Sequence, residues 1–216
     1  MNHRMTALIL FICLLHSSCT NETTQQPVEN SGVKSVFDSY KNSILKQDGS
    51  KAVKYVSLST IEYYGQMMDA ALTGKEEEVK KLSTIDKMMV LLLRHRIDPK
   101  LLANMTADEL FVYTVDNSWI KDSVINSDIG EINESNDKAT AEFINYGKKT
   151  PLKYTFMREN GQWKLDLTAV MPISDQAFKQ VLESSNLGED EYIFKILESL
   201  SGEKLSEDIW QPIIKE

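Results

Sequence analysis

Histidine and cysteine, the side chains that most often act as catalytic bases, nucleophiles and zinc ligands, are scarce in this sequence. Four of the five fall within the first nineteen positions, namely His3, Cys13, His16 and Cys19. If this segment is a processed leader, His95 is the only histidine left. A Ser-His-Asp triad could then use only His95, and neither a Cys-His dyad nor a zinc site built from His and Cys is available.

Other signatures of catalysis and binding are missing as well. The nine glycines stand one at a time, so the sequence has no glycine-rich phosphate loop. With 32 acidic residues, some pair will always lie close in space, so a glycosidase-type acid/base pair cannot be inferred. The net charge is −8 and no basic patch is interleaved with aromatics, which argues against a nucleic-acid partner. We expect no cofactor and no metal.

The N-terminus, residues 1–18, is predicted to be a signal peptide. After a short basic opening, Met5–Leu15 forms an uncharged apolar run of about eleven residues, the length of a signal-peptide core. This run is well short of the roughly 20 residues that a membrane span needs. Ser17 and Ser18, both small, then precede Cys19.

The sequence that ends at Cys19, LLHSSC, resembles the lipobox of bacterial lipoproteins, a pattern of the form Leu-small-small-Cys. The resemblance implies that the Cys19 thiol is diacylated and that cleavage makes this residue the new N-terminus. His16 stands where the usual Leu is found. Because Cys13 leaves with the signal peptide, Cys19 has no disulfide partner, which favours lipidation. The alternative is ordinary cleavage among the serines before Cys19, which releases a soluble periplasmic or secreted protein.

Residues 19–32 are expected to link the lipid to the folded part. Positions 20–31 are polar and carry only Glu22 and Glu29 as charges, so we predict a flexible tether. Two or more acyl chains would hold the protein durably at a membrane of the bacterial cell envelope. Thr20 in place of Asp favours the outer membrane over the inner one.

The first half of the remaining chain has helical periodicity. Apolar residues recur at spacings of three and four from Val33 to Ile44. Ser59–Glu62 has the spacing of a capping box and predicts a helix start. Ser83 predicts another, and the following run Met88–Leu93 is apolar on all sides, as is typical of a centrally buried helix. A further helix is predicted from Thr106 towards Val115.

The period then changes to two, which predicts an antiparallel meander. Asn160-Gly161 joins the last two strands and is the strongest short hairpin signal in the chain. Helices return afterwards, with Ser174-Asp175 as a cap and with Trp210 and Ile213 docking at the end. The predicted fold class is α+β, with N-terminal helices packed on a curved antiparallel sheet and extra C-terminal helices in residues 169–216. The predicted strands lie at 123–132, 138–146, 152–157 and 163–168.

This order of elements, with the early GSKAVKYVS…IEYY segment and the final strand NGQWKLDL, resembles the nuclear transport factor 2-like superfamily. The likeness covers residues 33–168. It implies a cone-shaped α+β domain with a hollow apolar pocket between sheet and helices. Some members use this pocket as an isomerase or dehydratase site, and many others are non-catalytic binding or dimerisation modules. No catalytic residue of the family can be carried over, because no catalytic motif matches.

Four residues are candidates for the lining of such a pocket. Tyr63 and Tyr64 fall where this fold often points aromatics inwards, although core packing is the default for both. His95 stands between two arginines at a predicted helix end, where helix capping is the simpler explanation. Trp119 precedes the sheet, where a tryptophan usually anchors packing.

Two functions from different classes remain open. The first is a cell-envelope lipoprotein whose domain binds an unidentified small ligand or envelope protein at the membrane surface, without catalysis. The second is a pocket enzyme that performs isomerase- or dehydratase-like proton transfer on a small apolar substrate, with Tyr64 or His95 as the acid/base. A buried ionisable side chain at the floor of an open cavity would favour the enzyme.

Overall fold

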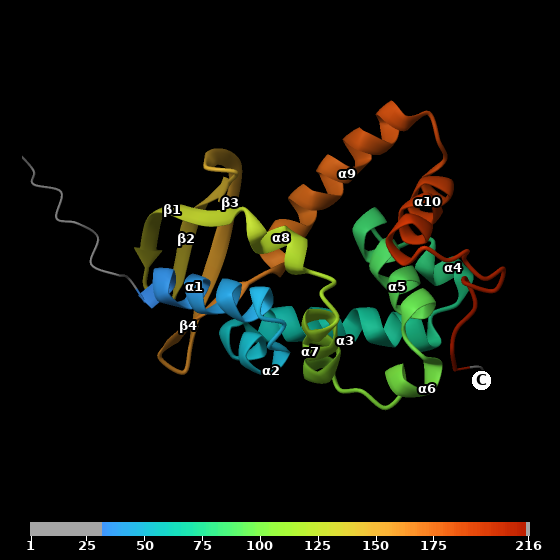
Figure 1. The fold of residues 1–216 in the computed structure, drawn as a ribbon, viewed down its shortest axis with the longest axis horizontal. Coiled ribbons are helices and arrows are strands. Elements are labelled where there is room, and N and C mark those ends of the chain that lie inside the picture. The colour runs from blue at the N-terminus through green and yellow to red at the C-terminus, as the bar shows by residue number, and fades with distance from the viewer. Residues whose placement is uncertain (1–31, 215–216) are drawn as a thin grey trace, which may run out of the picture.

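The computed structural model describes residues 32–214, in which a single antiparallel sheet lies at one end and the helices pack beside it and extend away from it (Figure 1). The predicted α+β class, with N-terminal helices on the sheet and C-terminal helices beyond it, is confirmed. The expected signal peptide (residues 1–18), Cys19 and the tether up to residue 31 lie outside the described residues.

The elements follow one another in the order helices, sheet, helices. The main helices are α1 (Gly32–Leu45), α3 (Leu58–Thr73), α5 (Thr84–Arg96), α7 (Ala107–Asp116), α9 (Met171–Ser185) and α10 (Glu189–Ser201). Shorter helical turns are α2 (Gly49–Ala52), η1 (Val53–Tyr55), α4 (Glu76–Val79), α6 (Pro99–Leu102), α8 (Lys121–Ile125) and η2 (Thr168–Val170). The strands are β1 (Ser127–Ser135), β2 (Lys138–Asn145), β3 (Lys148–Glu159) and β4 (Gln162–Asp166).

Helix α1 lies against the sheet and supplies one side of the core. Its apolar stripe, Val33, Phe37, Tyr40 and Ile44, is at most 3% exposed. These residues recur every three or four positions, so they occupy one face of the helix. That face contacts β1 and β4 of the sheet together with α8.

The sheet is a meander of order β1-β2-β3-β4, in which every pair is antiparallel. The predicted hairpin at Asn160-Gly161 is confirmed, with φ of +50° and +78°, the left-handed values that a two-residue turn of this kind requires. Trp163 is buried and shares the inner face with Phe156 and Leu165. Irregular register within the β1–β2 and β2–β3 pairs adds local twist to the sheet.

Some predicted helix boundaries are confirmed and others are wrong. The cap at Ser83 is confirmed, because its hydroxyl accepts a hydrogen bond from the Asp86 amide. The predicted start at Ser59 is wrong, because α3 is capped two residues earlier by Ser57. The Ser57 hydroxyl accepts a hydrogen bond from the Thr60 amide. The predicted strand from residue 123 is also corrected, because residues up to Ile125 form α8 and the strand begins only at Ser127.

Helix α5 contacts α3, α9 and α10 (Figure 1). Asp175 does not cap its own helix as predicted, because α9 already begins at Met171. Instead, the Asp175 carboxylate accepts a hydrogen bond of 3.2 Å from the Ile85 amide, at the N-terminus of α5. The predicted burial of the whole run Met88–Leu93 is wrong for half of it: Val90, Leu91 and Leu93 are buried, whereas Met88, Met89 and Leu92 are half-buried and face a cavity.

The C-terminal segment returns to the end of α3 through Arg94. This half-buried guanidinium donates to carbonyl oxygens of Ala70, Ala71 and Gly74 at 2.5–3.1 Å, and to those of Ile209 and Trp210 at 3.3 and 2.8 Å. The predicted docking of Trp210 is confirmed, because its ring lies 5.7 Å from that of Phe194 on α10. Within residues 32–214, no helix combines the length and the apolar character that crossing a membrane requires.

Candidate functional site

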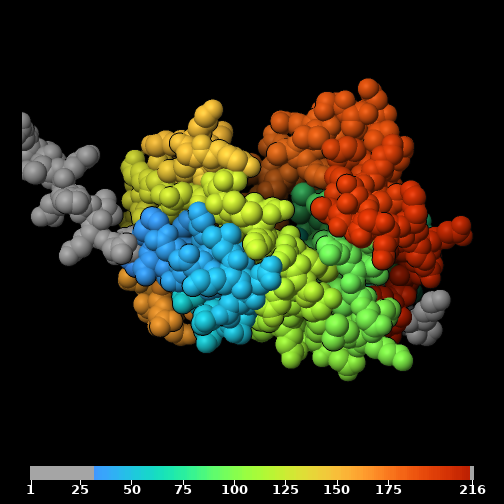
Figure 2. Space-filling model, viewed as in Figure 1, coloured from blue at the N-terminus to red at the C-terminus, as the bar shows by residue number. Residues whose placement is uncertain are grey.

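A cavity of about 320 Å³ lies where the sheet side of the molecule meets the helices α3, α5 and α9. In the space-filling view, the surface is hollowed between the sheet side and the orange helix α9 (Figure 2). The cavity is lined by four tyrosines, three methionines, one serine and six aliphatic residues: Tyr40, Tyr63, Tyr64, Tyr154, Met88, Met89, Met171, Ser123, Ile85, Leu92, Ile120, Val124, Leu167 and Val170.

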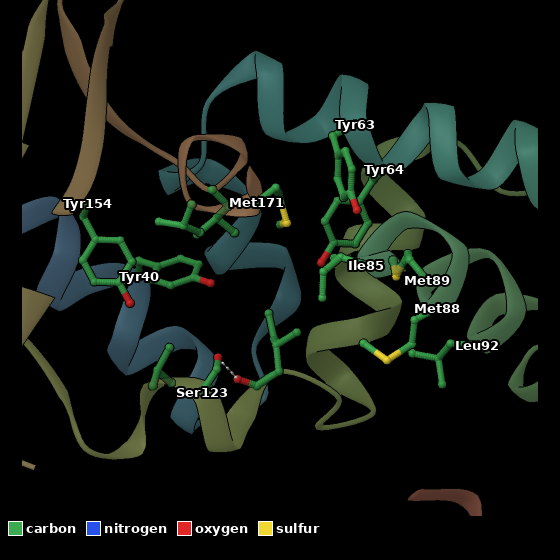
Figure 3. Close-up of a pocket in the computed structure, with 14 residues that line it drawn as sticks. Tyr40, Tyr63, Tyr64, Ile85, Met88, Met89, Leu92, Ser123, Tyr154 and Met171 are labelled. Atoms are coloured by element: carbon green, nitrogen blue, oxygen red, sulfur yellow. Dashed lines mark hydrogen bonds between the residues drawn. The ribbon is translucent and has the colours of Figure 1, made fainter. Parts of the chain in front are cut away.

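None of these lining residues is an Asp, Glu, Lys, Arg or His. The polar atoms that reach the cavity from side chains therefore belong to tyrosine hydroxyls and to Ser123. The Ser123 hydroxyl donates to the Ile120 carbonyl oxygen at 2.6 Å, drawn as a dashed line in Figure 3. The lining is thus apolar with a few phenol groups, a composition typical of sites for small organic ligands.

Tyr63 is bonded to the wall of the cavity. Its hydroxyl, on α3, donates to the Asp86 carboxylate on α5 at 2.9 Å, and Asp86 also accepts from the Ser83 hydroxyl at 2.8 Å. Burial, the Asp86 charge and this hydrogen bond all raise the pKa of Tyr63. Because its proton is held by Asp86, Tyr63 contributes mainly shape to the cavity.

Tyr40 and Tyr64 point their hydroxyl groups towards one another across the cavity, from α1 and α3 respectively (Figure 3). Both are buried, with exposed fractions of 3% and 6%. Burial raises the pKa of Tyr40 well above its ordinary value, and the neighbouring phenols of Tyr64 and Tyr154 raise it further. Burial also raises the pKa of Tyr64, an effect that a hydrogen bond with Thr114 partly opposes.

Tyr154 reaches the cavity from β3. Its ring packs against Phe37 at 5.4 Å and Phe143 at 5.0 Å, which fixes its position. Burial raises the pKa of Tyr154 to about 12, despite an opposing hydrogen bond with Ser127. All four phenols therefore remain protonated near neutral pH. They can donate and accept hydrogen bonds, but they are poor proton acceptors in a reaction.

The structure brings two of the four candidate pocket residues together, Tyr63 and Tyr64, whose rings meet edge-on at 6.2 Å. His95 does not line this cavity; its Nε2 lies 2.7 Å from the Ser201 hydroxyl, where α5 and α10 end. Trp119 is also elsewhere, packed edge-on against Tyr113 at 5.8 Å and beneath the Arg96 guanidinium at 4.7 Å. Cys19 lies outside the described residues.

The sequence interpretation missed several lining residues. Tyr40 belongs to the apolar stripe of α1, and Tyr154 alternates with polar neighbours on β3, so both have the pattern of ordinary core residues. Met171 follows the sheet without any distinguishing pattern. Only the folded arrangement of α1, α3, α5, α8, β3 and the start of α9 places these side chains around one space.

Within residues 32–214, no group of three or more His, Cys, Asp or Glu side chains is arranged to hold a metal ion. Comparison of the chain with protein-family models, with curated proteins and with solved structures gave no match. Its function is therefore argued from the cavity and from the sequence.

Proposed function

We propose that this protein is a lipid-anchored component of the bacterial cell envelope whose folded part binds a small apolar molecule without catalysis. The observation that carries the binding proposal is the cavity, about 320 Å³ in volume and lined by tyrosines and methionines with no charged side chain. Its volume is at the lower end of the range for small-ligand sites, roughly 300–1,000 Å³.

The lining suits a flat or compact apolar ligand. Met88, Met89 and Met171 have flexible, polarisable side chains that adapt to different ligand shapes and contact aromatic rings favourably. Removing about 200 Å² of ligand surface from water at roughly 25 cal/mol per Å² contributes about 5 kcal/mol before the costs of association. A gain of this size, less the costs of association, corresponds to weak or moderate affinity for a small probe.

The alternative, a proton-transfer enzyme, requires a base in the cavity. Tyr64 is buried with a raised pKa, so it does not ionise near neutral pH. His95, the other candidate, is hydrogen-bonded to Ser201 away from the cavity. With no carboxylate or imidazole among the lining residues, binding without catalysis is the function that the geometry supports better.

A titration with the neutral fluorescent probe N-phenyl-1-naphthylamine tests the binding proposal. We expect saturable fluorescence enhancement with the folded protein. Ser123→Trp adds an indole at the cavity lining and should weaken binding at least about ten-fold, equivalent to about 1.4 kcal/mol. Ile125→Trp, on the same helix but outside the lining and 44% exposed, is the matched control. No saturable binding, or equal loss in both variants, would contradict the proposal.

The envelope location rests on the sequence of the signal peptide and on Cys19, with the polar residues 20–31 as the link to the folded part. It is tested by the mass of the N-terminal peptide from protein isolated from membranes. A peptide that begins at Cys19 and carries acyl chains is expected. An unmodified peptide beginning at Ser18 or Cys19 would contradict lipidation.

A further inference from the structure

The Tyr40 hydroxyl is the polar group of the cavity that is left without a partner. Tyr40 is 3% exposed, and no residue in the described part of the chain donates a hydrogen bond to its hydroxyl or accepts one from it. In contrast, the Tyr63 hydroxyl is bonded to Asp86, and the Ser123 hydroxyl to the Ile120 carbonyl. Tyr40 thus presents a free donor and acceptor to the cavity (Figure 3).

In the described part of the chain, every side-chain polar atom that is sealed from solvent has a hydrogen-bond partner, so the Tyr40 hydroxyl, which has none, is open to the cavity. A hydroxyl that opens only into an apolar cavity depends on water or on a bound molecule for its hydrogen bond. The Tyr40 hydroxyl points to the centre of the cavity and faces that of Tyr64 (Figure 3). An acceptor oxygen of a bound molecule that lies against the Tyr40 hydroxyl would take its hydrogen bond on the side that faces Tyr64.

The lining also restricts the charge of that molecule. A buried carboxylate or ammonium loses its hydration and needs an opposite charge beside it. The cavity offers none, and the nearby carboxylate of Asp86 already accepts from Tyr63 and Ser83. A charged ligand would therefore be disfavoured relative to an uncharged one of the same shape.

We propose that the cavity selects uncharged apolar molecules that carry an acceptor oxygen, such as a ketone or an ester, and that the Tyr40 hydroxyl donates the hydrogen bond that recognises it. This inference rests on the proposed function, because it specifies the chemical class of the ligand that the same cavity binds. Tyr40 stays protonated near neutral pH, so the donor is present throughout the physiological range.

The experiment uses four probes that share one ring system and differ in the attached group. These are 2-acetylnaphthalene, 2-ethylnaphthalene, 2-naphthoate and 2-naphthylmethylamine, each titrated at pH 7 by calorimetry or by displacement of N-phenyl-1-naphthylamine. We expect the ketone to bind about five-fold more tightly than the hydrocarbon, the effect of one neutral hydrogen bond. The anion and the cation should bind on the order of 30-fold more weakly than the ketone, because neither finds a counter-charge.

Tyr40→Phe separates recognition from shape, since it removes only the hydroxyl. The affinity ratio of ketone to hydrocarbon should fall to about one, while the hydrocarbon binds as before. Tyr146→Phe, at a residue that is 74% exposed and outside the cavity, is the matched control and should keep the wild-type ratio. Thermal unfolding of each variant verifies that the compared proteins are folded.

The outcomes distinguish the two proposals. Equal binding of ketone and hydrocarbon by the wild-type protein, tighter binding of the naphthoate or the amine, or an unchanged ratio in Tyr40→Phe would overturn the inference while leaving an apolar binding cavity in place. If none of the four probes binds the folded wild-type protein, the proposed function fails together with the inference.

Discussion

Tyr63 on α3 and Asp86 on α5 are joined by a hydrogen bond of 2.9 Å that closes one wall of the cavity. The bond connects a buried phenol to a carboxylate that is itself held by the capping serine Ser83. Cavity wall and helix start are therefore parts of one small network. The Tyr63 hydroxyl is therefore already bonded to the protein, whereas the Tyr40 hydroxyl has no such partner in the described chain.

Tyr63→Phe should destabilise the protein by about 1.5–3 kcal/mol, the range for loss of a hydrogen bond to a charged group. The ring remains, so its edge-on contact with Tyr64 and the shape of the cavity are preserved. Urea unfolding measures the change. Tyr146→Phe, which is exposed, should stay within about 0.5 kcal/mol. Equal effects of the two substitutions would show that the Tyr63–Asp86 bond contributes nothing measurable.

Arg94→Lys should lower the free energy of unfolding by about 2–3 kcal/mol, although the positive charge is kept. The guanidinium donates through three nitrogens to carbonyls of two separate segments, a fork that a single ammonium cannot reproduce. Arg158→Lys serves as the control, because Arg158 is exposed and lies over the Trp163 ring. The free energies of unfolding should differ clearly; similar values would contradict a bridging role for Arg94.

Lys87 on α5 forms an ion pair with Glu189 on α10, and replacing Glu189 should destabilise the protein more than replacing Lys87. The Lys87 side chain is 5% exposed and lies 2.9 Å from Glu189, which is 34% exposed. Glu189→Gln leaves a buried ammonium with only the more distant Asp190 and should cost about 2 kcal/mol. Lys87→Met leaves a carboxylate that water can still reach, so about 1 kcal/mol is expected. The reverse order would contradict the burial argument.

An exposed ion pair between Lys195 and Glu191 provides the control for these substitutions. Lys195→Met breaks a pair in which both side chains are more than half exposed, and should change stability by less than about 0.5 kcal/mol.

Desolvation would raise the pKa of Glu189, but hydrogen bonds from Thr84 and Lys87 outweigh it and lower the pKa below 4.5. The pair therefore stabilises the fold above about pH 4.5, and its contribution is lost as the pH falls through the lower folded-state pKa. The stability difference between wild type and Glu189→Gln should shrink over that window.

Local sequence signals predicted the local structure well. The hairpin at Asn160-Gly161 and the cap at Ser83 depend on backbone preferences within four residues, and both are present. The start of α3 was misplaced because Ser57 and Ser59 are both capping residues, and the choice between them depends on packing. Ser57 is buried and its amide donates to the Leu165 carbonyl oxygen in β4, a contact that the local pattern does not contain.

The cavity could be predicted only in part, because it is formed by contacts between residues distant in the chain. Tyr63 and Tyr64 were candidates through a family resemblance, and they do line the cavity. Tyr40 and Tyr154 have the periodicity of core residues, and periodicity cannot show whether a hydroxyl points into packing or into space. Lys87 is similar, since a lysine on a helix is expected to be solvated, and its partner lies 102 residues away.

The central claim, that the tyrosine- and methionine-lined cavity binds a small uncharged apolar molecule, is tested most directly by methyl NMR of the methionines. The protein labelled with ¹³C at the methionine methyl groups is titrated with 2-acetylnaphthalene. We predict that the signals of Met88, Met89 and Met171 shift saturably, while those of Met105 and Met157, which are outside the cavity, stay in place. Saturable shifts at Met105 or Met157 with the cavity methionines unchanged, or no shift at any methionine, would contradict the account.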